Sequence, residues 1–215
     1  MARTELGPYV MPWLPPGRLV QVAGRGEFFV RVHEHPDPDA PVLLLLHGWT
    51  ASADLQFFTA YRALAERCSF VGIDHRGHGR GLRANVPFRL ADAADDAAAV
   101  LAALGVPPAI AVGYSMGGPI AQLTWHRHRQ RVAGLVLCAT ASEFAGTSGE
   151  RVFFSALGGL SVLARATPGR LRSGVGQRML LGRFEGTELG RWATDEVRRH
   201  DHRSVVEAGH AIGRF

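Results

Sequence analysis

The chain contains no lysine, so all 24 of its basic residues are arginine. Such a bias reflects the composition of a GC-rich genome more than a function. The arginines are scattered among apolar residues, whereas a nucleic-acid-binding surface gathers basic and stacking aromatic side chains. We therefore expect no nucleic-acid partner.

Cysteine is also scarce. The two cysteines, Cys68 and Cys138, lie beside or within apolar runs that resemble strands. A disulfide framework or a metal site needs more ligands at regular spacings. We therefore expect two reduced, buried thiols and no metal.

Long apolar runs are missing as well. No stretch approaches the roughly 20 residues that a membrane-spanning helix requires. The N-terminal segment has one basic residue, Arg3, ahead of Glu5 and is then interrupted by prolines, unlike a signal peptide. These features predict a cytoplasmic protein without a membrane span.

What the chain does have is an alternation of strand-like and helix-like segments. With 215 residues, of which 47% are hydrophobic and 20% charged, it can form one sizeable domain with a buried core. The alternation predicts an α/β fold with a mostly parallel sheet and flanking helices. We expect an antiparallel hairpin over 18–33, strands over 42–46, 69–73, 109–112 and 134–138, and helices over 53–66, 89–104 and 116–129.

The character of the sequence changes after about residue 142. Residues 151–215 contain no β-rich run, only helix-length segments separated by glycines or by Pro168. We therefore divide the chain into a core over 1–142 and a helical cap or lid over 143–215, and we expect little contact between the cap and the sheet.

The most informative motif is Gly113-Tyr114-Ser115-Met116-Gly117, between an expected strand and an expected helix. Gly-x-Ser-x-Gly in this place is typical of a nucleophile elbow, a turn so tight that only glycine tolerates the crowding beside the serine. The turn exposes the serine hydroxyl above a helix N-terminus. Ser115 is therefore the predicted nucleophile, and Gly113 and Gly117 support it.

A second motif, His47-Gly48-Trp49, directly follows the apolar strand 42–46. Acyl transfer requires two backbone N–H donors aimed at the developing oxyanion, one after the nucleophile and one from a loop after a neighbouring strand. The pattern predicts Met116 N–H and Trp49 N–H as the donors, with His47 and Gly48 as supporting residues. Alternatively, His-Gly is simply a turn and Trp49 a core aromatic.

A third motif, residues 74–81 (DHRGHGRG), follows the strand 69–73. In this order and spacing, the three motifs resemble the α/β-hydrolase family of the serine hydrolase type over about residues 18–140. The resemblance implies an eight-stranded sheet, Ser115 as nucleophile, and hydrolysis of a small ester-like substrate through an acyl-enzyme, with no metal or organic cofactor. It gives the 74–81 segment a structural role. By analogy, the serine excludes dehalogenases and epoxide hydrolases, which attack with a carboxylate.

The residues that would activate Ser115 are harder to assign. In this fold the triad follows the chain order Ser, Asp or Glu, His, and the resemblance places the last two after strands that follow the cap. Because no strand-like run follows residue 138, we expect a C-terminally truncated chain whose strand 134–138 is an unpaired edge. Glu143 is the candidate acid and His210 the candidate base, while His200 and His202 are expected to be solvated.

Two alternatives to an esterase stay open. The same scaffold could be a catalytically incomplete or non-catalytic binding protein, for which Ser115→Ala would leave the biological role intact. An acyltransferase or perhydrolase would use the same nucleophile and differ in the molecule that accepts the acyl group. The expected partner is a small-molecule substrate, and the sequence indicates no particular oligomeric state.

Overall fold

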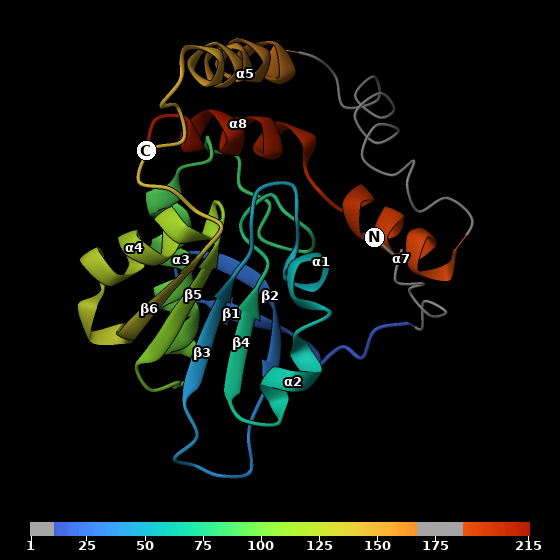
Figure 1. Cartoon of the computed structure of the whole chain (residues 1–215), viewed down its shortest axis with the longest axis vertical. Helices are drawn as coiled ribbons and strands as arrows, with labels where there is room; N and C mark the ends of the chain where they lie inside the picture. Colours follow the sequence, from blue (N-terminus) through green and yellow to red (C-terminus); the bar gives the residue numbers. More distant parts are fainter. Residues whose placement is uncertain (1–10, 167–186) are drawn as a thin grey trace, which may run out of the picture.

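The computed structural model describes residues 11–166 and 187–215, with the backbone alone over 160–166. Its centre is a six-stranded sheet in the order β1-β2-β4-β3-β5-β6 (Figure 1). The first two pairs, β1 with β2 and β2 with β4, are antiparallel, and the other three are parallel. The α/β class, the N-terminal hairpin and the mostly parallel sheet are confirmed. The strands are β1 (Gly17–Val22), β2 (Gly26–His33), β3 (Val42–Leu46), β4 (Ser69–Ile73), β5 (Ala109–Tyr114) and β6 (Val132–Cys138).

The described helices follow the expected order, with one exception. We expected a single helix over 53–66, which is wrong, because the chain breaks there into two short helices. The N–H of Ala60 bonds to the carbonyl of Phe57, three residues back, and this turn leaves Phe57 and Tyr61 in the same buried cluster. The helices are α1 (Ala53–Phe57), α2 (Tyr61–Ala65), α3 (Leu90–Ala103), α4 (Gly117–Arg127), α5 (Ser148–Ala166), α7 (Glu188–Arg198) and α8 (His202–Ile212), with a 3-10 turn at Arg129–Arg131.

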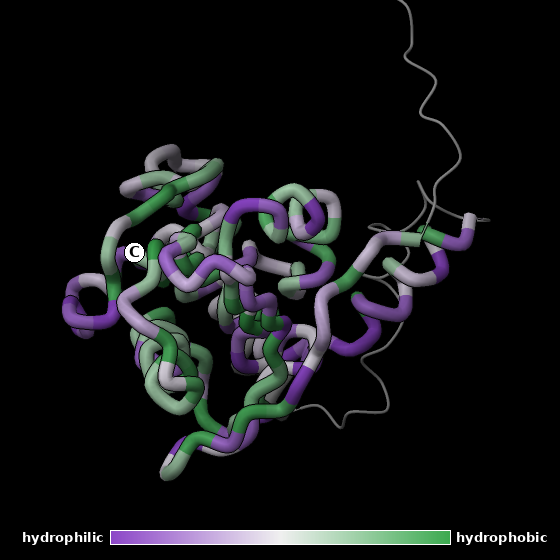
Figure 2. Tube along the Cα trace, turned by 90° about the horizontal axis from the view of Figure 1, so that it is seen from below, coloured by the Kyte–Doolittle hydropathy of each residue, from purple (hydrophilic) through white to green (hydrophobic). Residues whose placement is uncertain are grey.

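The side chains of β3 enter two separate hydrophobic clusters, because successive residues of a strand point to opposite faces. Leu44 and Leu46 belong to the larger cluster, which includes residues of α3, α4 and α8. Leu43 and Leu45 belong to a smaller cluster that α1 and α2 complete. Figure 2 shows hydrophobic segments, in green, running through the middle of the molecule. The apolar run 42–46 is therefore a strand covered on both faces.

The helix α8 crosses beside the carboxyl ends of the parallel strands, and α5 lies on its outer side (Figure 1). Ala208 and Ile212 of α8 are buried in the larger hydrophobic cluster. The helices α5 and α8 pack closely at Gly158, where an added Cβ would meet the ring of His210. The region after residue 142 therefore contributes α8 to the hydrophobic core.

The expected cap is helical wherever the structure describes it, at 143–166 and 187–215, apart from the connecting segments. Residues 167–186 of this region lie outside the described residues, and the division of the chain at residue 142 stays a prediction. None of the helices in the described ranges is long and apolar enough to span a bilayer.

The strand β6 lies at the edge of the described sheet, because β5 is the one strand that pairs with it there. Val136 and Leu137 are 44% and 45% exposed. The expected edge position of this strand is confirmed for the described part of the chain.

Candidate active site

Ser115 lies at the sharp turn from β5 to α4. Its φ of +50° is in the left-handed region, which costs a residue with a side chain roughly 1–2 kcal/mol. Two hydrogen bonds connect the turn to the end of β6 and the segment after it: Ser115 N–H donates to the carbonyl of Cys138 (2.9 Å), and the Thr140 hydroxyl donates to the Ser115 carbonyl (2.9 Å). The half-buried Ser115 hydroxyl has no hydrogen-bond partner among the described residues.

The glycines around Ser115 are required because backbone segments approach them closely. A Cβ at Gly113 would collide with the carbonyl of Gly117, and a Cβ at Gly117 would collide with the carbonyl of Leu46. The Gly-x-Ser-x-Gly pattern therefore forms the expected tight turn between a strand and a helix.

The loop after β3 lies against this turn. A Cβ built on Gly48 would be 3.4 Å from the Cβ of Ser115, so the expected donors at Trp49 and Met116 are each one residue from this contact. Neither backbone N–H makes a hydrogen bond within the described residues. Met116 is fully buried and precedes α4 as its N-cap, where the helix dipole favours negative charge. The arrangement is compatible with the predicted oxyanion hole.

His47 is completely buried and links two loops. Its Nε2 accepts a hydrogen bond from the N–H of His75 (3.0 Å), so Nδ1 carries the proton and donates to the carbonyl of Gly48 (2.8 Å). Burial, followed by the nearby His75 and His78, keeps the pKa of His47 well below its ordinary value of 6.5. With both ring nitrogens engaged, the neutral ring supports the loop that carries Trp49.

His47 belongs to a cluster of four buried histidines. The ring centroids are 4.2 Å apart for His47 and His75, 5.4 Å for His47 and His78, and 5.6 Å for His78 and His200. Burial lowers the pKa of His75 and of His78 to about 3, and it also lowers the pKa of His200. The expectation that His200 is solvated is wrong, because its side chain packs against the His47 and 74–81 loops and only 7% of the residue is exposed.

The structure does not bring the two candidate triad partners to Ser115. Glu143 is exposed in the segment after β6 and makes no hydrogen bond or ion pair with the described residues. His210 is partly exposed on α8, and its Nδ1 lies 3.3 Å from the carbonyl oxygen of Phe154. Across residues 11–166 and 187–215, no histidine is hydrogen-bonded to the Ser115 hydroxyl.

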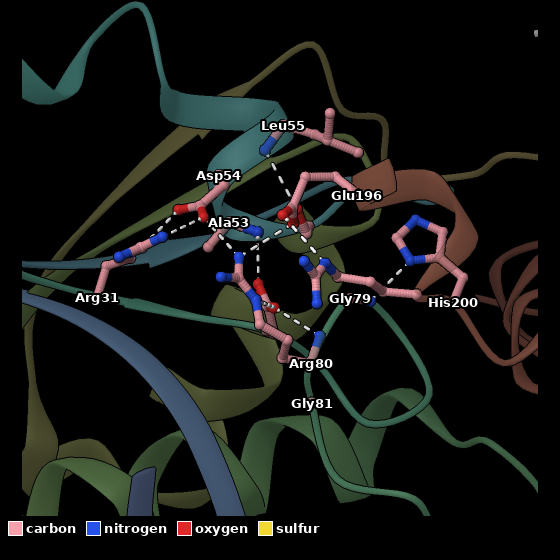
Figure 3. A network of polar contacts seen from close by, with 12 residues as sticks. Arg31, Ala53, Asp54, Leu55, Gly79, Arg80, Gly81, Glu196 and His200 are labelled. Atoms are coloured by element: carbon pink, nitrogen blue, oxygen red, sulfur yellow. Dashed lines mark hydrogen bonds and ion pairs between the residues drawn. The ribbon is translucent and has the colours of Figure 1, made fainter. Parts of the chain in front are cut away.

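A buried ionic network connects α1, β2, the 74–81 loop and α7 (Figure 3). Asp54 is 0% exposed and accepts two hydrogen bonds from Arg31 (2.9 and 2.7 Å) and one from Arg80 (2.5 Å). Arg80 also donates to Glu196 of α7 (3.0 Å). Burial acts to raise the pKa of Asp54, but the hydrogen bonds from both arginines outweigh it and leave the pKa below its ordinary value.

Asp74, at the start of the third motif, joins the same region. Its carboxylate accepts hydrogen bonds from Ala53 N–H (2.8 Å) and Arg80 N–H (2.9 Å), and burial raises its pKa to about 6. These contacts fit a structural role for the 74–81 segment. In the described part of the chain, no group of three or more His, Cys, Asp or Glu side chains is placed to hold a metal ion.

Sequence reasoning missed Thr140, Asp54 and the burial of His200. Each depends on contacts between segments far apart in the chain, such as the 150 residues that separate His200 from Thr50. A buried aspartate on a short helix and a histidine in an arginine-rich tail carry no local pattern that distinguishes them from solvated residues.

Curated relatives match parts of the chain. A bifunctional esterase/perhydrolase, DCH, from Acinetobacter calcoaceticus is 41% identical over 80 residues, which cover 37% of this chain and 29% of the relative. The AB hydrolase superfamily protein YisY from Bacillus subtilis is 32% identical over 127 residues, which cover 59% of this chain and 46% of the relative. The matched stretches therefore span less than half of these relatives.

Solved structures share the fold over nearly the whole chain. An esterase from Exiguobacterium antarcticum superposes with a TM-score of 0.69 at 22% identity, covering 92% of this chain and 74% of the esterase. The sequence profile described as alpha/beta hydrolase fold matches residues 41–157, a range that includes all three motifs. Because that range is more than half of the 215 residues, the chain belongs to the α/β hydrolase fold family.

Proposed function

We propose that this chain carries the nucleophile and the oxyanion hole of a serine esterase that hydrolyses small carboxylic esters. The observation that carries the proposal is the close approach of the Gly48–Trp49 loop to Ser115. The strained φ of Ser115, its hydroxyl without a partner among the described residues and the unused N–H groups of Trp49 and Met116 support the same assignment. The curated esterase relative agrees with it.

In the proposed reaction, the Oγ of Ser115 attacks the carbonyl carbon of the ester while its proton passes to a base. Negative charge moves to the carbonyl oxygen, which accepts hydrogen bonds from Trp49 N–H and Met116 N–H. Collapse of this intermediate breaks the bond to the alcohol, which leaves with a proton, and an acyl-enzyme remains. Water then gives a proton to the base and attacks the acyl carbon, and collapse of this second intermediate releases the acid while the base returns the proton to Ser115 Oγ.

We propose that none of the ten histidines of these 215 residues, all of which lie in the described ranges, is the base of this cycle. Two observations support this part of the proposal. In the described ranges no histidine reaches the Ser115 hydroxyl, and the Exiguobacterium antarcticum esterase matches over 74% of its length. Acylation of Ser115 is therefore the more direct test for these 215 residues than turnover.

The test is labelling with a fluorophosphonate probe at alkaline pH, in which Oγ gives its proton to hydroxide and displaces fluoride from phosphorus. We expect one covalent adduct on Ser115, read by intact mass and peptide mapping, and none in Ser115→Ala. Ser142→Ala, which changes an exposed serine after β6, is the matched control and should label like the parent. Equal labelling of Ser115→Ala and the parent, or none in the parent, would contradict the proposal.

A second candidate activity, perhydrolysis, is favoured by the relative from Acinetobacter calcoaceticus, which is named a bifunctional esterase/perhydrolase. It uses the same acyl-enzyme, but hydrogen peroxide instead of water attacks the acyl carbon and a peracid leaves. Product analysis with an acetate ester and added peroxide separates the two reactions. Acetate as the sole product would exclude perhydrolysis.

A further inference from the structure

The imidazole of His200 connects two loops of the candidate site. Its Nδ1 accepts a hydrogen bond from Gly79 N–H (2.7 Å), and its Nε2 lies 3.0 Å from the carbonyl oxygen of Thr50. Because a carbonyl oxygen can only accept, Nε2 carries the proton and Nδ1 is the unprotonated acceptor. Burial lowers the pKa of His200 and so favours this neutral form. Figure 3 shows the ring beside Gly79.

Thr50 is the residue after Trp49, and its backbone is strained. Its φ of +62° lies in the left-handed region, which is uncommon for a β-branched residue. Such a conformation persists when the surroundings hold it in place. Within the described residues, the Thr50 carbonyl oxygen accepts a single hydrogen bond, and its donor is His200 Nε2–H.

Trp49 itself is fixed from the same side. Its indole Nε1–H donates to the carbonyl of Val205 on α8 (2.6 Å). A Cβ at Gly209 would collide with the six-membered part of the Trp49 ring, so the indole packs directly on the α8 backbone. Two neighbouring residues of the loop are thus held by the segment 200–209.

We propose that His200 is a positioning residue for the oxyanion hole: together with the Val205 carbonyl, it holds the Trp49–Thr50 backbone so that Trp49 N–H faces the oxyanion. This inference rests on the proposed function of Ser115. His200 acts through Thr50 and touches neither the substrate nor the nucleophile. A displacement of the donor matters because oxyanion stabilisation depends on donors fixed at hydrogen-bond distance before the reaction.

The segment around His200 has other anchors, so loss of one bond does not detach it. Asp201 N–H donates to the carbonyl of Gly77 (2.8 Å), and Arg203 donates to the carbonyl of Ala84 (2.9 Å). Glu207 accepts a hydrogen bond from Phe88 N–H (2.8 Å). Substitution of His200 should therefore leave a folded protein.

Two variants separate the bond to Thr50 from the bond to Gly79. In His200→Asn, the amide can replace Nδ1 as the acceptor from Gly79, but it is too short to reach Thr50. In His200→Gln, the longer amide can reach the Thr50 carbonyl. His202→Asn changes a neighbouring histidine without a hydrogen bond among the described residues and is the matched control.

The measurement is the fluorophosphonate reaction, with its maximal rate separated from the probe's binding constant. We expect His200→Asn to lower the maximal rate about tenfold with an unchanged binding constant, His200→Gln to recover most of the rate, and His202→Asn to match the parent. Amide ¹⁵N spectra give an independent readout: the Trp49 backbone and indole signals should move in His200→Asn. If that variant unfolds, Trp49→Phe, which removes the bond to Val205, should also lower the maximal rate.

The outcomes distinguish this inference from the proposed function. If the parent labels at Ser115 and His200→Asn has the parental maximal rate, the positioning role of His200 is overturned. A change in the binding constant alone overturns it too. In both cases the assignment of Ser115 as the nucleophile still holds. Equal losses in His200→Asn and His200→Gln also overturn it. Failure of the parent to label at Ser115 overturns both.

Discussion

Gly117 lies against the carbonyl oxygen of Leu46, at the point where α4 passes the end of β3. A methyl group at position 117 has no space there, because the obstacle is backbone and cannot rotate away. The contact fixes the distance between the elbow and the loop that begins at His47.

The first prediction follows from this contact. Gly117→Ala should lower the free energy of unfolding by about 1–3 kcal/mol, as overpacking does, and should reduce labelling of Ser115. Urea unfolding and the fluorophosphonate assay measure the two effects. In Gly159→Ala, an exposed position on α5 with open space, stability should stay equal or rise by up to about 1 kcal/mol. Equal behaviour of the two variants would contradict the prediction.

The second prediction concerns the strain at Ser115. At a φ of +50°, alanine has about the same conformational strain as serine, whereas glycine has almost none. Ser115→Gly should therefore be more stable than Ser115→Ala by about 1 kcal/mol, although neither variant can be acylated at this position. Thermal and urea unfolding of the two variants provide the comparison. A Ser115→Gly protein less stable than Ser115→Ala would show that the backbone is relaxed.

The third prediction concerns Asp54, whose carboxylate is buried between Arg31 and Arg80. Asp54→Asn leaves two guanidinium groups without their shared anion and should cost about 3–5 kcal/mol of stability. Asp195→Asn removes an exposed pair with Arg198, whose side chains are 61% and 62% exposed, and should change stability by less than about 1 kcal/mol. Similar losses of unfolding free energy in Asp54→Asn and Asp195→Asn would contradict the prediction that the buried ion pair contributes more than the exposed one.

The fourth prediction is a loss of stability in acid. The pKa of His78 is lowered to about 3 in the native state, so unfolded chains take up a proton below pH 6.5 while native ones do not. The contribution of this histidine is therefore present above pH 6.5 and is lost as the pH falls toward 3. Asp74 acts in the opposite direction: its pKa is raised to about 6, so its contribution is present below its ordinary pKa and is lost as the pH rises through 6.

Urea unfolding between pH 7 and pH 4 measures this dependence. His78→Gln should reduce its slope by about 1.4 kcal/mol per pH unit below pH 6, the value for one proton. His126→Gln, at an exposed position of α4, should not alter the slope. If the free energy of unfolding of His78→Gln depends on pH as steeply as that of the parent, the proton is taken up by a residue other than His78.

Local patterns were sufficient for the strands, for the helices α3 and α4, and for the elbow. The apolar run 42–46, the hairpin around Gly24 and the glycines beside Ser115 each act within a few residues, so the printed sequence contains their physical cause. The prediction of a single helix over 53–66 was wrong because the break in this segment has no local cause. Its helical composition is local, but the break that buries Phe57 and Tyr61 in one cluster depends on packing against the sheet.

The α/β fold, the family and the position of Ser115 in a strained turn can be read from the sequence, because glycine spacing and hydrophobic periodicity are properties of neighbouring residues. In contrast, the sharing of Asp54 by Arg31 and Arg80 and the burial of His200 against Thr50 follow from the folded arrangement of distant segments. These contacts join segments as far as 150 residues apart. Burial and partner choice at such distances arise only when the whole chain has folded, and no local pattern encodes them.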